Sequence, residues 1–195
     1  MRQAIAGVTP SSVQETTIWT IWPTIARFNW ACWLGRRYLN NFGIANILTV
    51  GNLWAVATIP LHLLMYFVKL APQLRITLKA LGSDAELSIP GLCINYRLTN
   101  RRVVVQRLTL RLELFILPLQ LEFVEDRSVS FDRFDTIEII QRPGQQWYSS
   151  GDLVFRNGNV ETFRIAGVPN PGAFRQTCLE ARNVYVGIRE VVDAA

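Results

Sequence analysis

The sequence has little histidine and no closely spaced cysteines, and both shortages limit the chemistry open to it. His62 is the single histidine of 195 residues, and Cys32, Cys93 and Cys178 lie far apart. A Ser-His, Cys-His or histidine–metal arrangement therefore cannot form within the part of the chain that follows His62. A nucleophile-elbow motif, a phosphate-binding glycine loop and an EF-hand pattern are also missing. We therefore predict a protein that is not an enzyme, with no catalytic residues, no metal site and no small-molecule substrate.

Charge is missing from one long stretch. Residues 38–68 contain no Asp, Glu, Lys or Arg, and Arg37 and Lys69 flank them. A helix needs about 20 apolar residues to cross the hydrocarbon of a bilayer, so we predict a transmembrane helix at 42–68; a buried core helix is the alternative. Small and amide side chains in this stretch suit contact with partner helices better than contact with lipid. These candidate contact residues are Asn46, Gly51 and Asn52.

Acidic side chains are almost absent from the first part of the chain. Residues 1–80 hold seven basic residues and one acid, a net charge of +6, whereas residues 81–195 hold thirteen Arg and fourteen acids, a net charge of −1. Nucleic acid binding would need the surplus on the folded domain, so we exclude it. A basic linker at 69–91 suits anionic headgroups of the lipid bilayer. We predict a single-pass protein of a bacterial inner membrane with its C-terminal domain in the cytoplasm.

Tryptophan is concentrated near the N-terminus, where four of the six lie between residues 17 and 39. A helix there would place four tryptophans on one face. The segment is too polar for a confident span, so we predict that residues 1–41 hold an amphipathic helix at the membrane interface; a second span is the alternative. The candidate contact residues on this face are Trp19, Trp22, Trp30 and Trp33.

From residue 92 onward the hydrophobic period becomes two, which predicts β-strands with one buried face. Ile94–Thr99 alternates, Asn100-Arg101 indicates a turn, and apolar residues then alternate from Val103 to Phe123. A hairpin at 153–165 has Asn157-Gly158, a pair suited to a type I′ turn. Asn170 followed by Pro171 predicts the start of an amphipathic helix that ends the domain.

Three of these segments resemble bacterial membrane-anchored pleckstrin-homology-like domains. They are Tyr96-Arg-Leu-Thr-Asn-Arg-Arg-Val-Val-Val105, the Phe155-Arg-Asn-Gly-Asn hairpin and the helix entry Gly167-Val-Pro-Asn-Pro171. The resemblance covers about residues 92–188. It implies a mainly β fold, a pleckstrin-homology-like β-sandwich or barrel closed by a C-terminal helix over residues 92–195, behind the predicted transmembrane helix. It also implies a scaffold for protein or lipid contacts rather than an enzyme.

Two charged clusters and the histidine are the remaining candidate sites. Five acids between residues 125 and 138 could serve acid–base chemistry, but the solvated exterior of a strand accounts for them better. Arg101 and Arg102 head an arginine cluster that either pairs with neighbouring acids or contacts a headgroup or protein. His62 is the candidate ligand of a tetrapyrrole pigment, and a hydrogen bond within its own helix is the alternative. No other cofactor is expected.

The leading functional hypothesis is a non-enzymatic accessory subunit of a multi-subunit integral membrane complex, in which the chain stabilises the packing of other integral membrane subunits. A photosynthetic reaction-centre and light-harvesting assembly is the example that fits a tryptophan-rich segment among pigment proteins. The alternative is a membrane-tethered module that binds lipid headgroups or acts as a signalling scaffold.

Overall fold

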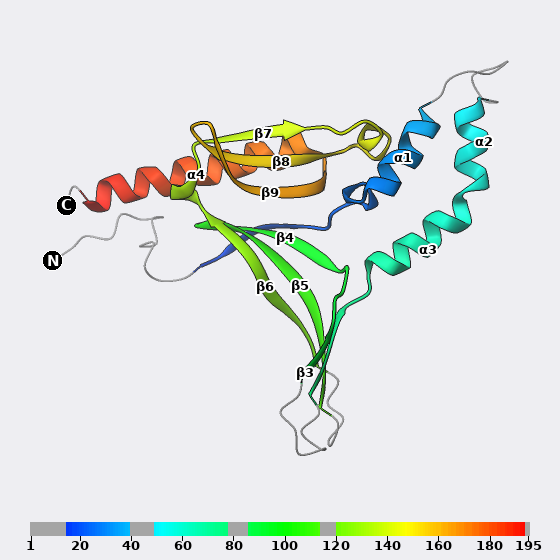
Figure 1. Cartoon of the computed structure of the whole chain (residues 1–195). Coiled ribbons are helices and arrows are strands. Elements are labelled where there is room, and N and C mark those ends of the chain that lie inside the picture. Colours follow the sequence, from blue (N-terminus) through cyan, green and yellow to red (C-terminus); the bar gives the residue numbers. More distant parts are fainter. Residues whose placement is uncertain (1–14, 40–48, 78–85, 114–119, 194–195) are drawn as a thin grey trace.

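Over the residues that the structure describes, the protein has a mixed α/β fold with two sheets and four α-helices (Figure 1). The computed structural model describes residues 15–39, 49–77, 86–113 and 120–193. The α-helices are α1 (Asn29–Tyr38), α2 (Val50–Ala57), α3 (Ile59–Lys69) and α4 (Pro171–Asp193). The prediction of a mainly β sandwich or barrel behind a transmembrane helix is wrong, because the two sheets are separate and helices are a substantial part of the fold.

The first sheet has six strands. They are β1 (Thr17–Ile21), β2 (Gln73–Thr77), β3 (Glu86–Ile89), β4 (Ile94–Thr99), β5 (Arg102–Glu113) and β6 (Gln120–Ser130). Strand β5 is the centre of this sheet. Because β6 pairs with β5 over residues 102–111, the other edge of β5 is shared by β4, at 103–107, and β2, at 109–113. The lower parts of β5 and β6, together with β2 and β3, therefore extend beyond the rest of the molecule (Figure 1).

The core lies between the first sheet, the second sheet and α4. The second sheet is formed by β7 (Thr136–Ile140), β8 (Ser150–Asn157) and β9 (Val160–Pro169), in that order. Val103 and Val105 of β5 point into the core, where they meet Phe155 of β8 and the α4 side chains Phe174 and Cys178. Burial of each such large side chain stabilises the fold by roughly 1.5–3 kcal/mol. The core therefore holds the two sheets and α4 together, and we call this part of the protein the body.

The predicted span at 42–68 is broken. Residues 40–48 lie outside the described part, and the remainder forms α2 and α3, which are bent by 55° relative to each other. Among the described residues no single helix is long and apolar enough to cross a membrane; only this bent pair passes, taken together, by length and composition. Pro60 causes the break, because it has no N–H and its ring clashes with the carbonyl four residues earlier. The predictions of one transmembrane helix and of a single-pass protein in a bacterial inner membrane are wrong.

The Trp-rich segment and the linker also differ from expectation. Residues 17–21 form β1, which pairs with β4, so Trp19 and Trp22 are not on the helix that carries Trp30 and Trp33. The basic linker expected at 69–91 contains β2 and β3. The β8–β9 hairpin is present, but its connecting residues are Gly158 and Asn159 rather than the predicted Asn157-Gly158.

Candidate interaction site

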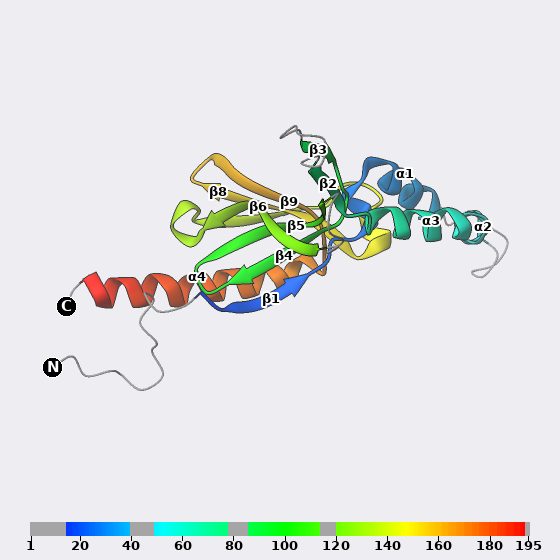
Figure 2. The same cartoon turned by 90° about the horizontal axis from the view of Figure 1, so that it is seen from below.

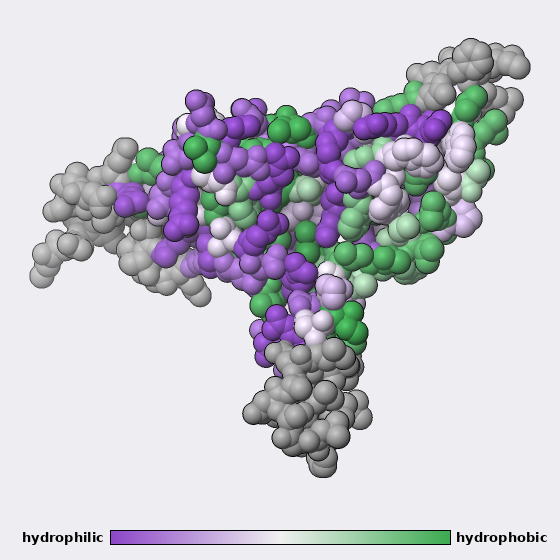
Figure 3. Space-filling model, viewed as in Figure 1, coloured by the Kyte–Doolittle hydropathy of each residue, from purple (hydrophilic) through white to green (hydrophobic). Residues whose placement is uncertain are grey.

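Helices α2 and α3 present many exposed apolar side chains, and we call this pair the helical arm. The arm extends away from the body, at the end of the molecule opposite the end of α4 (Figure 2). Its surface is predominantly hydrophobic, whereas the body is largely hydrophilic (Figure 3). Seven of its large apolar side chains are more than half exposed: Leu53, Val56, Ile59, Leu63, Leu64, Tyr66 and Phe67. An apolar surface of this extent marks an interaction site rather than an ordinary exterior.

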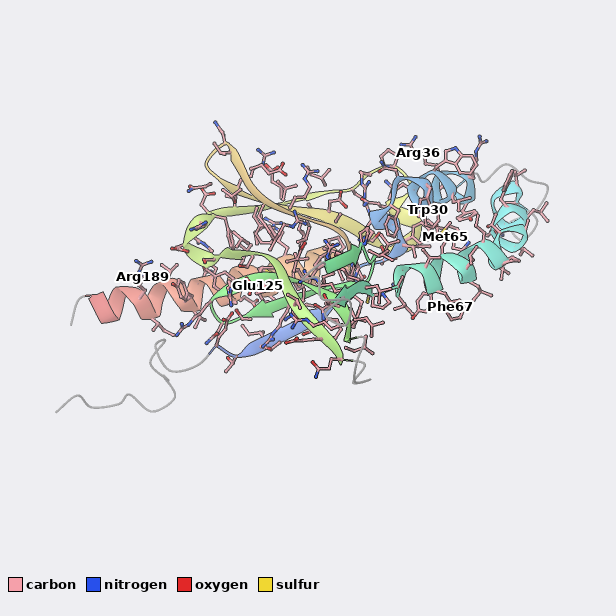
Figure 4. All side chains as sticks on the ribbon, turned by 60° about the horizontal axis from the view of Figure 1, so that its bottom comes forward. Trp30, Arg36, Met65, Phe67, Glu125 and Arg189 are labelled. Carbon is pink, nitrogen blue, oxygen red and sulfur yellow. The ribbon has the colours of Figure 1, made fainter. Side chains whose placement is uncertain are left out.

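The arm is exposed on more than one side. Leu64 and Tyr66 are two residues apart, which places them on nearly opposite sides of α3, and both are more than half exposed. Phe67 also projects into the open, whereas Met65 lies on the side of α3 that faces α1 and is half-buried (Figure 4). Helix α3 has no charged residue before Lys69. Helices that are hydrophobic all round are normally buried, in the core of a large protein or among other apolar helices. The described residues of the chain nevertheless leave most apolar side chains of the arm exposed.

Basic side chains border the arm at both ends. Arg36 and Arg37 end α1, where the Arg37 guanidinium lies over the Trp33 ring at 5.3 Å and a shallow hollow of about 500 Å³ opens. At the other end the Lys69 ammonium donates to the Pro23 carbonyl oxygen at 3.1 Å and lies 5.0 Å from the centre of the Tyr66 ring. Burial lowers the pKa of Lys69. The arm is thus an uncharged apolar surface between two positive borders.

A buried polar cluster attaches the arm to the body. Thr58, at the bend, donates its hydroxyl proton to the Trp54 carbonyl oxygen at 2.7 Å. Its oxygen therefore accepts from the Tyr38 hydroxyl at 2.6 Å. His62 Nδ1 lies 3.1 Å from the Thr58 carbonyl oxygen, which only accepts, so Nδ1 carries the proton and Nε2 accepts from the Tyr148 hydroxyl at 3.2 Å. Burial raises the pKa of both tyrosines, which are therefore neutral donors here.

This cluster bears directly on the predicted pigment ligand. Both ring nitrogens of His62 already have hydrogen-bond partners. Ligation of a metal through Nε2 would require Tyr148 to move away. The second interpretation of His62, a hydrogen bond within its own helix, corresponds to the contact of Nδ1 with the Thr58 carbonyl oxygen. Pigment ligation remains a prediction without support from this geometry.

A second buried network joins α1 and the preceding turn to the second sheet. The Asp152 carboxylate on β8 accepts from the Gln145 amide at 2.7 Å and from the Gly167 backbone N–H at 3.0 Å. Its other oxygen lies 3.1 Å from Arg142 Nε, as an ion pair that is not aligned for a hydrogen bond. Arg142 then donates to the Ala26 carbonyl oxygen at 3.1 Å. Through Arg142, Asp152 thereby joins β8 to the turn at Ala26, which lies more than 100 residues earlier in the chain. We call this network the joint.

Two glycines allow α1 to approach this joint closely. A Cβ at Gly35 would lie 2.2 Å from the Gly144 carbonyl oxygen, and a Cβ at Gly144 would lie 2.0 Å from the Cys32 carbonyl oxygen. Gly144 also has a φ of 95°, a conformation that other residues rarely adopt. The backbone of α1 therefore contacts the loop before η4 (Gln145–Tyr148) directly. The contact positions η4, and with it Tyr148, against the arm.

The predicted tryptophan contacts are divided between body and arm. The Trp19 ring packs on Phe174 at 5.5 Å, so its role is partly in the core. The Trp30 ring stacks on Phe28 at 5.9 Å, while Trp33 is exposed next to the arm. Two of the predicted partner contacts in the span, Gly51 and Asn52, lie on α2. Gly51 is buried, the Asn52 backbone N–H caps α2 by donating to Thr49, and Asn46 lies outside the described residues.

Of the two arginines that head the cluster, Arg102 is paired with carboxylates, whereas the buried Nε and Nη2 of Arg101 have no hydrogen-bond partner among the described residues. Arg102 donates to Glu15 at 2.8 Å and to Glu125 at 2.9 Å, at the rim of a hollow of about 130 Å³. Hydrogen bonds from Arg102 lower the pKa of Glu15. Arg101 lies in the tight turn after β4, where its backbone N–H donates to the Thr99 hydroxyl. The positive charge of Arg102 is thereby balanced by two carboxylates, which leaves little local excess for an anionic headgroup.

Sequence reasoning missed the residues that hold the arm in place. Tyr38, Thr58 and Tyr148 come from three separate elements, and no spacing connects them. Asp152 was equally hidden, because no motif marks its pairing with Gln145, Arg142 and Gly167, and the contact of Arg142 with Ala26 spans more than 100 residues. Gly144, after a proline, was the one available signal of a tight loop. Among the described residues no group of three His, Cys, Asp or Glu side chains is placed to hold a metal ion.

Comparison with known proteins adds no relative. No family model, no curated protein and no solved structure matches this chain. The resemblance to pleckstrin-homology-like domains therefore remains a prediction.

Proposed function

We propose that the protein is a non-enzymatic accessory subunit that attaches to a multi-subunit integral membrane complex through its helical arm. The observation that carries this proposal is the exposed, uncharged surface of α2 and α3, which is mounted on the body by two buried polar networks. Contacts that fix the arm to the body favour binding, because a preorganised surface loses less conformational entropy when it binds.

Apolar helices of partner subunits are the occupant that best suits this surface. Helix α3 has exposed apolar side chains on opposite sides, and the groove of a soluble partner would cover only one of them. Membrane subunits offer several apolar helices side by side, with which a bent pair can interdigitate.

The lipid-headgroup module is supported less well. Such a site needs a local excess of basic charge, and Arg102 is neutralised by Glu15 and Glu125. An enzymatic function is also supported less well, since two of the acidic candidates are engaged in ion pairs: Glu125 with Arg102 and Asp126 with Arg107.

The test is co-purification with the tagged full-length chain from membranes solubilised in a mild detergent. We expect the wild-type chain to migrate in a native gel with a multi-subunit complex. The double variant Val56→Asp and Phe67→Asp places two charges on the arm and should release the chain from that complex. The matched control, Val160→Asp with Val184→Asp, places two charges at equally exposed apolar positions on the body and should leave the complex intact.

Two outcomes would contradict the proposal. One is a wild-type chain that migrates as a monodisperse monomer. The other is an arm variant that remains in the complex as well as the control does. Binding of the full-length chain to protein-free anionic liposomes with the same dependence on Val56 and Phe67 would assign the arm to lipid instead.

A further inference from the structure

Along β5, the apolar side chains change from one side of the first sheet to the other. Near the body, Val103 and Val105 face the core. Because side chains alternate along a strand, Arg107 and Arg111 lie on the same side as these valines, and Leu108 and Leu110 lie on the opposite side. Beyond residue 107 the apolar side of β5 is therefore the one that faces away from the core. We call it the outer face.

A row of apolar side chains crosses four strands on the outer face. Leu121 of β6 pairs with Leu110 of β5, Leu110 with Leu74 of β2, and Leu74 with Ile89 of β3. Neighbouring strands lie about 4.8 Å apart, so the row is roughly 14 Å long. The next row adds Phe123, which pairs with Leu108 and packs against the Trp22 ring at 5.8 Å.

The other side of the same four strands is polar. Gln120 pairs with Arg111, Arg111 with Arg75, and Arg75 with Ser88. This extension of the sheet is therefore amphipathic, as a sheet is when it packs against a second layer. The core of the chain lies on the polar side and cannot supply that layer. Within the described part of the chain, the Trp22 ring covers part of Phe123, while Ile89 and Leu121 at the two ends of the first row remain about half exposed.

The exposed apolar area is sufficient for the centre of a dimer interface. Its four most exposed members are between 40% and 57% accessible. Together they present on the order of 400 Å² of apolar surface, since large side chains bury roughly 150–250 Å² each. A stable interface buries about 800 Å² per partner, of which somewhat more than half is apolar. The four side chains are Trp22, Ile89, Leu121 and Phe123.

The charges beside the apolar rows are self-complementary. On the outer face, nearer to the β4–β5 turn, Arg97 and Arg102 lie with Glu15 and Glu125 around the hollow described above. Two positive and two negative side chains give this rim no net charge. A second copy related by a two-fold axis would therefore meet no like-charge repulsion there.

We propose that the outer face is a homodimer interface, in which the apolar rows of two copies pack against each other around a two-fold axis. The surface is distinct from the helical arm, so a dimer leaves both arms available to the complex. The polar residues around the rows form the rim of the interface, and Leu121 and Phe123 lie at its centre.

Site-specific cross-linking of the full-length chain in detergent tests this interface. The three native cysteines are buried, so an added surface cysteine would be the reactive one. Leu121→Cys should give a covalent dimer with a short bismaleimide. Gln120→Cys, one residue away on the polar side of β6, should remain monomeric under the same conditions. Light scattering of the uncross-linked wild type should give twice the 22.2 kDa of one chain.

Substitution then separates this interface from the arm. Leu121→Arg should halve the mass measured by light scattering, whereas Gln120→Arg and the arm variant Val56→Asp with Phe67→Asp should stay dimeric. A monomeric wild type, equal cross-linking from both cysteines, or loss of the dimer in the arm variant would each overturn the proposal. Failure of this test leaves attachment through the arm unaffected, because that attachment is read in a different assay.

Discussion

Substitution of Asp152 is the most informative test of the buried contacts that hold α1, and through η4 the arm, in position. Its carboxylate is almost fully buried and, within the described residues, is the one acidic group that pairs with Arg142. Replacement by alanine leaves the Arg142 guanidinium without a counterion and removes the acceptor for the Gln145 amide and the Gly167 N–H. The folded state therefore loses three hydrogen bonds, from Arg142, Gln145 and Gly167, together with the ion pair to Arg142.

The expected cost is large. Removing one partner of a buried ion pair destabilises a protein by about 3–5 kcal/mol. The remaining exposure of Arg142, 28% of its side chain, places the expected value for Asp152→Ala at the lower end, about 3 kcal/mol. Asp152→Asn keeps one acceptor oxygen, so we expect a smaller loss of roughly 1.5–3 kcal/mol, the size of a hydrogen bond to a charged group.

Urea unfolding followed by circular dichroism measures these free energies. Glu138→Ala is the matched control, because it removes the exposed ion pair with Arg156, which is worth less than about 1 kcal/mol. If Asp152→Ala lowered the free energy of unfolding by no more than Glu138→Ala does, the joint would not hold α1 to the second sheet as described.

Three further outcomes follow from single contacts. Gly144→Ala should destabilise the protein by more than about 1 kcal/mol in urea unfolding, because of its positive φ and the close carbonyl, whereas Gly172→Ala in the open first turn of α4 should not. Tyr148→Phe should lower the free energy of unfolding by about 0.5–1.5 kcal/mol, since it removes the donor to His62, and an unchanged value would refute that bond. The lowered pKa of Glu15 gives stability that is present above its ordinary value of 4.5 and is lost as the pH falls through the lowered pKa. In unfolding measured across this range, Glu15→Gln should therefore show a shallower loss than the wild type; an identical loss would contradict the pairing.

Local patterns predicted the elements whose partners are close in sequence. The turn at Asn100-Arg101 between β4 and β5 is confirmed, as are the β8–β9 hairpin and the helix that begins at Pro171. Each is determined by alternation or by a turn or cap within a few residues. Phe174 and Cys178 of the predicted helix face are indeed in the core.

Elements determined by distant contacts were not predictable in this way. The helical spacing of Trp19, Trp22, Trp30 and Trp33 is a coincidence, because pairing with β4 makes residues 17–21 a strand. Tertiary context overrides local propensity in such segments. The sequence likewise gave no sign that Thr58 would bond to Tyr38. The bend itself had a local signal in Pro60, which the prediction of one continuous span did not treat as a break. The joint at Asp152 depends on contacts across more than 100 residues.

The central claim is that the arm contacts protein subunits of a larger assembly. Incorporation of a photo-reactive phenylalanine analogue at Phe67, in the full-length chain and in intact membranes, tests it directly. The account predicts a covalent adduct with a membrane subunit of the complex from this position, and none from the same analogue at Val184 on α4. No protein adduct at Phe67, or an equal yield from the two positions, would contradict the account.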